Sequence, residues 1–271
     1  MLLLIGLIIG LVLGLTGAGG SVFAVPLLML MGGLSMGDAV GISLGAVAAS
    51  TLYGSIRNWR GKKILWVPGM ILAATGALTA PFGKWLGMQT PELWLLTGFN
   101  LLAMIIAVRM WISAARTPER ARVVRAGNFS AEPSLGLLCN LSKTGQFELR
   151  PRCVSGLVLG GILVGLLSGL FGVGGGFLIV PLLLALSPIS MAQAVSTSLI
   201  IIAAVSGSGF ISHVAMNPHS DWAVLGLVVT GGVLGMMLGQ AISHKIANAR
   251  LQKLFAICLI AISVTTLALH Y

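Results

Sequence analysis

Long apolar stretches alternate with short polar segments along the whole chain, and this pattern predicts membrane-spanning helices. Most of the apolar blocks have about the 20 residues that an α-helix needs to cross a bilayer core of about 30 Å. The mean hydropathy of +1.03, with 57% hydrophobic and 8% charged residues, gives the same indication. We expect an all-α integral membrane protein that passes several times through the inner membrane of the cell. The eight blocks are Leu2–Met31, Gly37–Ile56, Ile64–Leu86, Leu93–Trp111, Val154–Leu186, Ala192–Ile211, Trp222–Ile242 and Leu251–Leu269.

A polar insert over residues 113–152 separates the first four blocks from the last four. It carries seven basic residues, and short basic segments stay on the cytoplasmic side of a membrane. We therefore expect a first transmembrane repeat over residues 1–112, a cytoplasmic linker over residues 113–152 and a second transmembrane repeat over residues 153–271.

The net charge of +10 does not indicate a nucleic-acid partner, because the basic residues lie in short loops, where the positive-inside rule accounts for them. The three cysteines, Cys139, Cys153 and Cys258, are scattered without a C-x-x-C pair or a histidine cluster. They predict neither a metal site nor a disulfide framework, and no motif indicates a cofactor.

The two groups of blocks are copies of one another. Pro181 follows Pro26 by 155 residues, and the same offset superposes "SMAQAVSTSL" on "SMGDAVGISL". About half of the aligned positions in these stretches are identical, which indicates duplication rather than shared composition. Duplicated membrane halves commonly build transporters.

Loop charges indicate that the two copies have opposite orientations. The loop after the second block is strongly basic, whereas the matching loop, residues 212–221, has no lysine or arginine. The next pair of loops reverses this contrast. Since basic loops lie inside, equivalent loops face opposite sides and the repeats are expected to be inverted. The basic residues are Arg57, Arg60, Lys62 and Lys63 in the first loop, and Lys245, Arg250 and Lys253 in the last.

Inversion requires an odd number of crossings in each half, although each half has four blocks. A straight helix over Leu2–Met31 would be about 45 Å long, which exceeds the thickness of the bilayer core. Glycine clusters interrupt this block at Gly17–Gly20 and the matching block at Gly172–Gly176. We predict that each broken block is a re-entrant hairpin with arms of about 20 Å, which leaves three full spans in each half.

These motifs resemble the sulfite exporter TauE/SafE family, also described as a four-toluene-sulfonate-uptake-type permease family. The resemblance rests on "GLTGAGGSVFAVPLL" with "SMGDAVGISL" in one half and "GLFGVGGGFLIVPLL" with "SMAQAVSTSL" in the other, and it covers nearly the whole chain. It implies transport of sulfite, thiosulfate, sulfoacetate or other sulfonates. The first half departs from the pattern at Ser21, which stands where the second half has Gly176. The two half-sites are therefore not expected to be equivalent.

The glycine clusters are the first candidate for a substrate site. A turn in the membrane leaves amides without helical partners, and this is tolerated only where the turn faces protein or a water-filled cavity. Successive glycine N–H groups can form a nest for an oxyanion, and the start of the next helix adds its positive dipole end. The alternative is that the glycines only permit close packing, which we favour for the rows Gly6, Gly10, Gly14 and Gly161, Gly165, Gly169. The predicted substrate contacts are Gly17, Ala18, Gly19, Gly20, Gly172, Val173, Gly174, Gly175 and Gly176.

Hydroxyl side chains follow each glycine cluster and form a second set of candidates. Ser43 in the first half, and Ser196, Thr197 and Ser198 in the second, could donate hydrogen bonds to sulfonate oxygens. The alternative is that they bond to carbonyls of their own helices. The sequence leaves both interpretations open.

Four further polar residues are candidates for a gate or for secondary contacts with the substrate. His213 and its counterpart Asn58 end their blocks, where they could gate the path, although a place at the membrane interface is favoured. Asp38, matched by Gln193, is expected to cap the second block.

Charged residues that could couple transport to another ion are scarce. Apart from Asp38, no carboxylate lies in or at the edge of an apolar block, and Lys84 and Arg109 are expected to extend toward the interface. An anion leaving a negative interior gains about 2.3 kcal/mol per charge per 100 mV. An exporter or facilitator of small anions therefore fits better than an accumulating importer.

Two other functions remain open from the sequence. A transporter of another small anion or metabolite is the first. An intramembrane enzyme is the remote alternative, because the chain has no H-E-x-x-H, P-loop or G-x-S-G motif and Ser168 with His213 is the only pair of note. No catalytic or metal-binding residue is therefore predicted.

The loop charges generate a topological prediction. Residues 113–152 should be cytoplasmic and both termini external, because the linker and "RNWRGKK" share the inner side. A membrane-impermeant thiol reagent added to intact cells should label Tyr271→Cys and should miss Ala126→Cys. Labelling of Ala126→Cys under these conditions would overturn the inverted arrangement.

Overall fold

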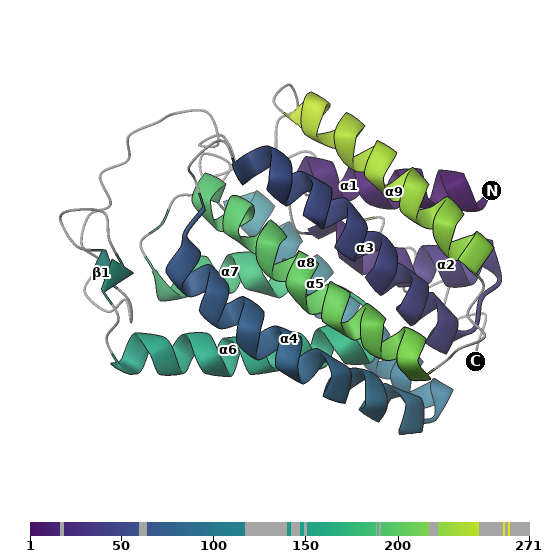
Figure 1. Ribbon diagram of the computed structural model, residues 1–271, viewed down its shortest axis with the longest axis horizontal. Helices are drawn as coiled ribbons and strands as arrows, with labels where there is room; N and C mark the ends of the chain where they lie inside the picture. Colours follow the sequence, from purple (N-terminus) through teal and green to yellow (C-terminus); the bar gives the residue numbers. More distant parts are fainter. Residues whose placement is uncertain are drawn as a thin grey trace.

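The computed structural model describes residues 1–16, 19–59, 64–116, 140–141, 147–148, 151–187, 189, 191–216, 222–243, 257 and 260. In this part of the chain the helices follow the predicted apolar blocks, and most of the linker and of the block Leu251–Leu269 lies outside it (Figure 1). The helices are α1 (Leu2–Thr16), the 3-10 helix η1 (Gly19–Phe23), α2 (Ala24–Gly32), α3 (Met36–Trp59), α4 (Trp66–Gln89), α5 (Glu92–Arg116), α6 (Pro151–Phe171), α7 (Gly176–Leu186), α8 (Met191–Met216) and α9 (Trp222–Ser243).

Local sequence signals set the junction between α2 and α3. Gly33 has a φ of 65° and ends α2, and its N–H donates to Met29 O at 3.1 Å. Ser35 then caps α3: the Asp38 N–H donates to Ser35 Oγ at 3.3 Å, and Ser35 Oγ donates to Asp38 Oδ2 at 2.7 Å. Asp38 therefore takes part in the cap, but the capping residue is Ser35. The expectation that Asp38 itself is the cap is wrong, because the cap lies three residues earlier, at Ser35.

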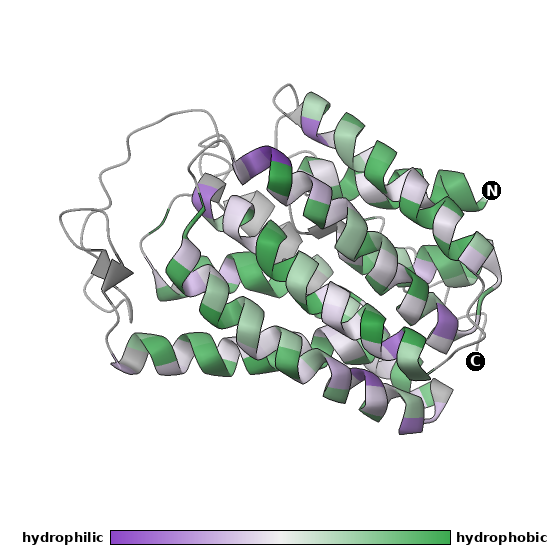
Figure 2. Cartoon of the chain, viewed as in Figure 1, coloured by the Kyte–Doolittle hydropathy of each residue, from purple (hydrophilic) through white to green (hydrophobic). Residues whose placement is uncertain are grey.

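Four helices of the described residues, α3, α6, α8 and α9, are long and apolar enough to cross a membrane. Hydrophobic residues dominate along the sides of the helices and hydrophilic ones gather toward their ends (Figure 2). Many large apolar side chains on these sides are exposed, including Leu52, Leu159 and Ile211, as expected where the neighbour is lipid. The chain is thus a multi-pass membrane protein.

Both long blocks are broken at their glycine clusters, as predicted, but the arms are unequal. Helices α1, α2 and α7 have 15, 9 and 11 residues, or roughly 22, 14 and 16 Å. Helix α6 has 21 residues, or about 31 Å, which is long enough to cross the bilayer alone. The expectation of half-length arms is therefore wrong for α6. The helix begins three residues before the apolar block, at Pro151, a residue type suited to the first helical position.

Two details near the linker also differ from expectation. Two-residue strands, β1 (Asn140–Leu141) and β2 (Phe147–Glu148), pair antiparallel, so the chain is not purely helical. Strands this short carry too few residues for an alternating pattern to be visible in a sequence. Cys153 is disulfide-bonded, which corrects the expectation of no disulfide, since isolated cysteines do not reveal their pairing through spacing.

The two halves of the chain pack by exchanging helices. Helix α1 of the first half lies along α9 of the second, and α6 of the second half lies along α4 of the first (Figure 1). Helices α3 and α8 pack against each other, α3 also contacts α9, and α8 also contacts α4. A single core cluster therefore includes residues of both halves, such as Ile9, Leu44, Leu157 and Ile202.

The glycine rows make the exchanged contacts possible. A Cβ added at Gly6, Gly10 or Gly14 would meet the α9 backbone, and one added at Gly161, Gly165 or Gly169 would meet α4. Helix backbones approach this closely in membranes where small residues recur every four positions. The packing interpretation favoured for these rows is confirmed. The contacted positions are Val228, Gly232 and Met236 on α9 and Leu72, Gly76 and Ala80 on α4, a constant offset of 156 rather than 155 residues.

This packing generates a stability prediction. Gly10→Ala places a methyl group against the Gly232 carbonyl and should lower the free energy of unfolding by about 1–3 kcal/mol. Gly226→Ala on α9 is the control, because a Cβ there meets nothing within 4 Å. Thermal unfolding in detergent measures both variants. Equal midpoints for the two would show that the α1–α9 contact is looser than described.

Candidate functional site

The second glycine break is a tight turn that only glycine accommodates well. Helix α6 ends at Phe171 and α7 begins at Gly176, and Gly172, Gly174 and Gly175 between them have φ values of 69°, 66° and 67°. Such left-handed backbone is costly for residues with a Cβ. The amides of Gly174 and Gly175 have no hydrogen-bond partner among the described residues, and they lie at the N-terminal end of α7.

The turn lies inside the helix bundle, against α3 and α8. Ser43 Oγ on α3 is 2.8 Å from Gly172 O, its acceptor across the interface, and equally far from Val40 O in its own helix. A Cβ at Gly174 would lie 2.9 Å from both Val47 Cγ1 on α3 and Ser206 Oγ on α8. The turn therefore faces protein on two sides, as a broken helix in a membrane requires.

Two buried hydroxyls beside this turn have no hydrogen-bond partner among the described residues: Ser168 on the last turn of α6 and Ser206 on α8. A Cβ at Gly175 would lie 3.7 Å from Ser168 Cβ, and Ser206 adjoins Gly174. Sequence reasoning assigned neither of them to the substrate site. Ser206 could have been found from its spacing, because it lies eight residues after Ser198 and shares that face of α8.

The first glycine break has a different form. Helix α1 ends at Thr16, and the chain resumes as the 3-10 helix η1 before α2, while Gly17 and Ala18 lie outside the described residues. Ser21, which replaces the glycine of the other half, is fully buried, and its hydroxyl has no partner among the described residues. The expected inequivalence of the two breaks is therefore visible in their secondary structure.

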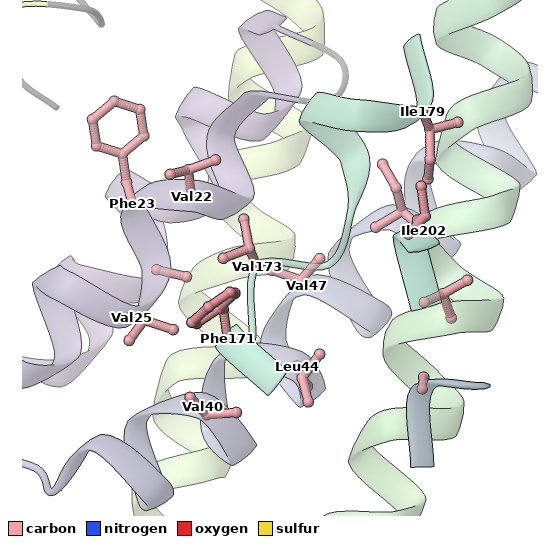
Figure 3. Close-up of a cluster of buried hydrophobic side chains, with 14 of the residues drawn as sticks. Val22, Phe23, Val25, Val40, Leu44, Val47, Phe171, Val173, Ile179 and Ile202 are labelled. Atoms are coloured by element: carbon pink, nitrogen blue, oxygen red, sulfur yellow. The ribbon is translucent and has the colours of Figure 1, made fainter. Parts of the chain in front are cut away.

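The two broken segments meet through apolar side chains. Helix α7 contacts η1, and Val173 in the second turn lies among Val22 of η1, Val47 of α3 and Phe171 (Figure 3). Phe171 also packs edge to face on Phe99 of α5, with ring centroids 6.2 Å apart. The structure thus brings the predicted glycine segments together and places a hydrophobic cluster at their contact.

The other predicted hydroxyls are mainly engaged with backbone. Ser198 Oγ donates to Val195 O at 2.8 Å in its own helix, and Thr197 Oγ1 accepts from the Leu65 N–H at 3.0 Å. Ser196 is buried, and Gln193 and Asn58 are partly buried near the two ends of the α3–α8 pair. Ser43, by contrast, reaches the glycine turn through its hydrogen bond to Gly172 O.

Two residues expected at the interface are buried instead. Lys84 is 3% exposed and donates from Nζ to Gly37 O at 3.1 Å, and His213 is 2% exposed with its ring against Gly41. Both lie close enough to Asp38 for its carboxylate to act on them. Their expected interfacial placement is corrected. For His213 the physical reason is that Gly41 leaves room for its ring on α3, and for Lys84 it is that the Gly37 carbonyl on α3 accepts its hydrogen bond.

The described residues contain no group of three or more His, Cys, Asp or Glu side chains suited to a metal ion. The groups at the turn are amides and the hydroxyls of Ser168 and Ser206, all of which can donate hydrogen bonds. Such a set of donors suits a multi-oxygen anion.

Comparison with known proteins covers nearly the whole chain. Residues 2–266 match the family described as "Sulfite exporter TauE/SafE". A "Probable membrane transporter protein" of Xylella fastidiosa strain 9a5c is 30% identical over 96% of this chain and 91% of the relative. The "Probable membrane transporter protein YunE" of Bacillus subtilis is 27% identical over 97% of this chain and 94% of the relative. No solved structure gives a significant match.

The hydroxyls of Ser43 and Ser206 are predicted to differ in their contribution to stability. Ser43→Ala removes the hydrogen bond from α3 to Gly172 O and should lower the free energy of unfolding by about 1 kcal/mol. Ser206→Ala removes a hydroxyl with no partner among the described residues, so it should leave the unfolding midpoint unchanged or raise it. Thermal unfolding in detergent compares the variants. A large loss in Ser206→Ala would reveal a structural bond at that hydroxyl.

Proposed function

The chain belongs to the sulfite exporter TauE/SafE family, and we propose that this membrane transporter carries small sulfur oxyanions, such as sulfite, thiosulfate or organosulfonates, out of the cell. Family membership supplies the class of protein. The substrate is inferred from the donors gathered at the second glycine turn, together with the name of the family.

The observation that carries the proposal is the glycine turn with the unpaired amides of Gly174 and Gly175 and the adjacent hydroxyls of Ser168 and Ser206. Buried donors without acceptors are costly unless a ligand or water satisfies them. A sulfonate or sulfite oxygen accepts several hydrogen bonds at once, and the N-terminal end of α7 favours negative charge. Val173 and its apolar neighbours would have to separate for an anion to enter, so the described arrangement corresponds to a closed site.

The matching break in the first half is proposed to complete the site from the opposite face. We infer inverted repeats from the loop charges, and the reciprocal packing of α1 on α9 and α6 on α4 is the pattern that a pseudo-two-fold axis would produce. Contact between η1 and α7 supports a shared site between the two breaks. Rocking of one half against the other would then open the site to each side in turn.

Export rather than accumulation follows from the energetics. A negative membrane potential drives an anion outward by about 2.3 kcal/mol per charge per 100 mV. Asp38 is the one carboxylate inside an apolar block, so the blocks have too few acidic side chains for a proton or sodium relay. Neither an intramembrane enzyme nor a passive anchor would explain donors gathered at a broken helix.

Flux measurements test the proposal directly. Proteoliposomes should release sulfite, thiosulfate and small organosulfonates faster than chloride and should not release potassium. Gly174→Val should abolish this flux, because the added side chain would collide with Ser206 and Val47 and cannot adopt positive φ comfortably.

The matched control is Gly207→Val on the neighbouring helix α8, where a Cβ meets nothing within 4 Å and flux should persist. Protein amount and size-exclusion behaviour should be compared for both variants. If Gly174→Val folds normally and carries sulfite with unchanged apparent affinity, the glycine breaks are architecture and the site lies elsewhere.

A further inference from the structure

We propose that Lys84 supplies the positive charge that holds the anion at the second glycine turn, and that this charge makes the two halves of the transporter functionally unequal. The inference rests on the proposed function, because it identifies the residue that selects for anions at that same site. It starts from the burial of Lys84, which the sequence did not predict.

Lys84 contacts two helices that border the glycine turn, α6 through its backbone and α3 through its ammonium. A Cβ at Gly169, three residues before the turn, would lie 2.8 Å from the backbone N of Lys84. The ammonium reaches Gly37 O at 3.1 Å, three residues before Val40, whose Cα would lie 2.8 Å from a Cβ at Gly172. The acceptor of the ammonium thus lies about one helical turn along α3 from Val40, the residue that contacts the start of the broken segment.

The Lys84 ammonium has donors to spare. It carries three N–H groups, and the acceptor found for it among the described residues is Gly37 O alone. Asp38 acts on it electrostatically, but that carboxylate is exposed and accepts from Ser35. A buried ammonium with one neutral acceptor is poorly satisfied, and an anion at the turn would supply both the counter-charge and the missing acceptors.

The other half has neutral residues at the same positions. Contacts of the glycine rows define the match, because Gly169 adjoins Ala80 and Lys84 whereas Gly14 adjoins Met236 and Gln240. Lys84 therefore corresponds to Gln240, and the repeat offset pairs Asp38 with Gln193 and His213 with Asn58. Each ionisable side chain of the cluster Lys84, Asp38 and His213 therefore has an uncharged amide at the equivalent position of the other half. Under this proposal, one end of the transport path has a charged anion-binding group and the other end has none.

Asp38 reduces the attraction of Lys84 for an anion. Its negative charge lies near Lys84 and His213, so it opposes an incoming anion and partly neutralises the lysine field. A dianion should feel Lys84 more strongly than a monoanion, because the Coulomb energy scales with the product of the charges. Selectivity between divalent and monovalent sulfur anions is therefore a direct measure of the Lys84 contribution.

The test uses the full-length protein and the substitutions Lys84→Gln, Lys84→Arg and Asp38→Asn. Thiosulfate and methanesulfonate are the probes, measured by half-saturating concentration for flux and by the thermal stabilisation that each confers in detergent. Lys84→Gln installs the amide found at Gln240 and should raise the half-saturating concentration of thiosulfate about tenfold or more, with a smaller effect on methanesulfonate. Lys84→Arg should preserve the preference for thiosulfate. Arg57→Gln, which removes an exposed charge on α3, is the matched control and should change neither.

Asp38→Asn provides a variant whose expected effect is a gain. Removing the carboxylate should lower the half-saturating concentration of thiosulfate several-fold, while asparagine still serves near the helix start. A misfolded protein cannot bind more tightly, so this variant decides the matter if Lys84→Gln does not fold. Unchanged thiosulfate preference in a folded Lys84→Gln, or unchanged affinity in Asp38→Asn, overturns the role of Lys84.

The two proposals can fail separately. If the unsubstituted protein moves no sulfur anion, the proposed function is wrong. Thermal stabilisation by thiosulfate in the unsubstituted protein but not in Lys84→Gln would still support an anion site at Lys84. Stabilisation that is equal in both would overturn it.

Discussion

The fold depends on one constraint: a backbone amide or carbonyl in hydrocarbon must find a partner within the protein. The chain nevertheless breaks its helical path between α6 and α7 at glycines of positive φ, so the backbone groups of this turn must be covered by protein. Helices α3 and α8 do this, with Ser43 bonded to Gly172 O and with Val47 and Ser206 against Gly174. The unpaired amides of Gly174 and Gly175 lie beside the hydroxyls of Ser168 and Ser206, and this group of donors is the basis of the proposed anion site.

Close helix packing holds this arrangement in place. The glycine rows of α1 and α6 bring their backbones against α9 and α4 of the opposite half, so neither half forms its packing surface alone. The apolar contact of Val22, Phe171 and Val173 lies where the broken segments of the two halves meet.

Duplication did not leave the halves identical. One break is a turn of three positive-φ glycines, and the other continues into a 3-10 helix with Ser21 buried beside it. The ionisable cluster of Lys84, Asp38 and His213 has amide counterparts in Gln240, Gln193 and Asn58. If Lys84 binds the anion, the apparent affinity would differ between the two faces, whereas the membrane potential and the anion gradient would still set the direction of net movement.

The sequence by itself determined the class of protein, the apolar blocks, the duplication and the positions of both glycine breaks, because hydropathy, periodicity and repeated glycines are local properties. It did not determine the length of α6, the short strands, the bond at Cys153 or the burial of Lys84 and His213. Only the tertiary structure decided that Lys84 turns inward, because the acceptor of its ammonium, the Gly37 carbonyl, lies on a different helix. Only the tertiary structure brought the Ser206 hydroxyl of α8 to the turn, whereas Ser168 lies there because it is in the last turn of α6.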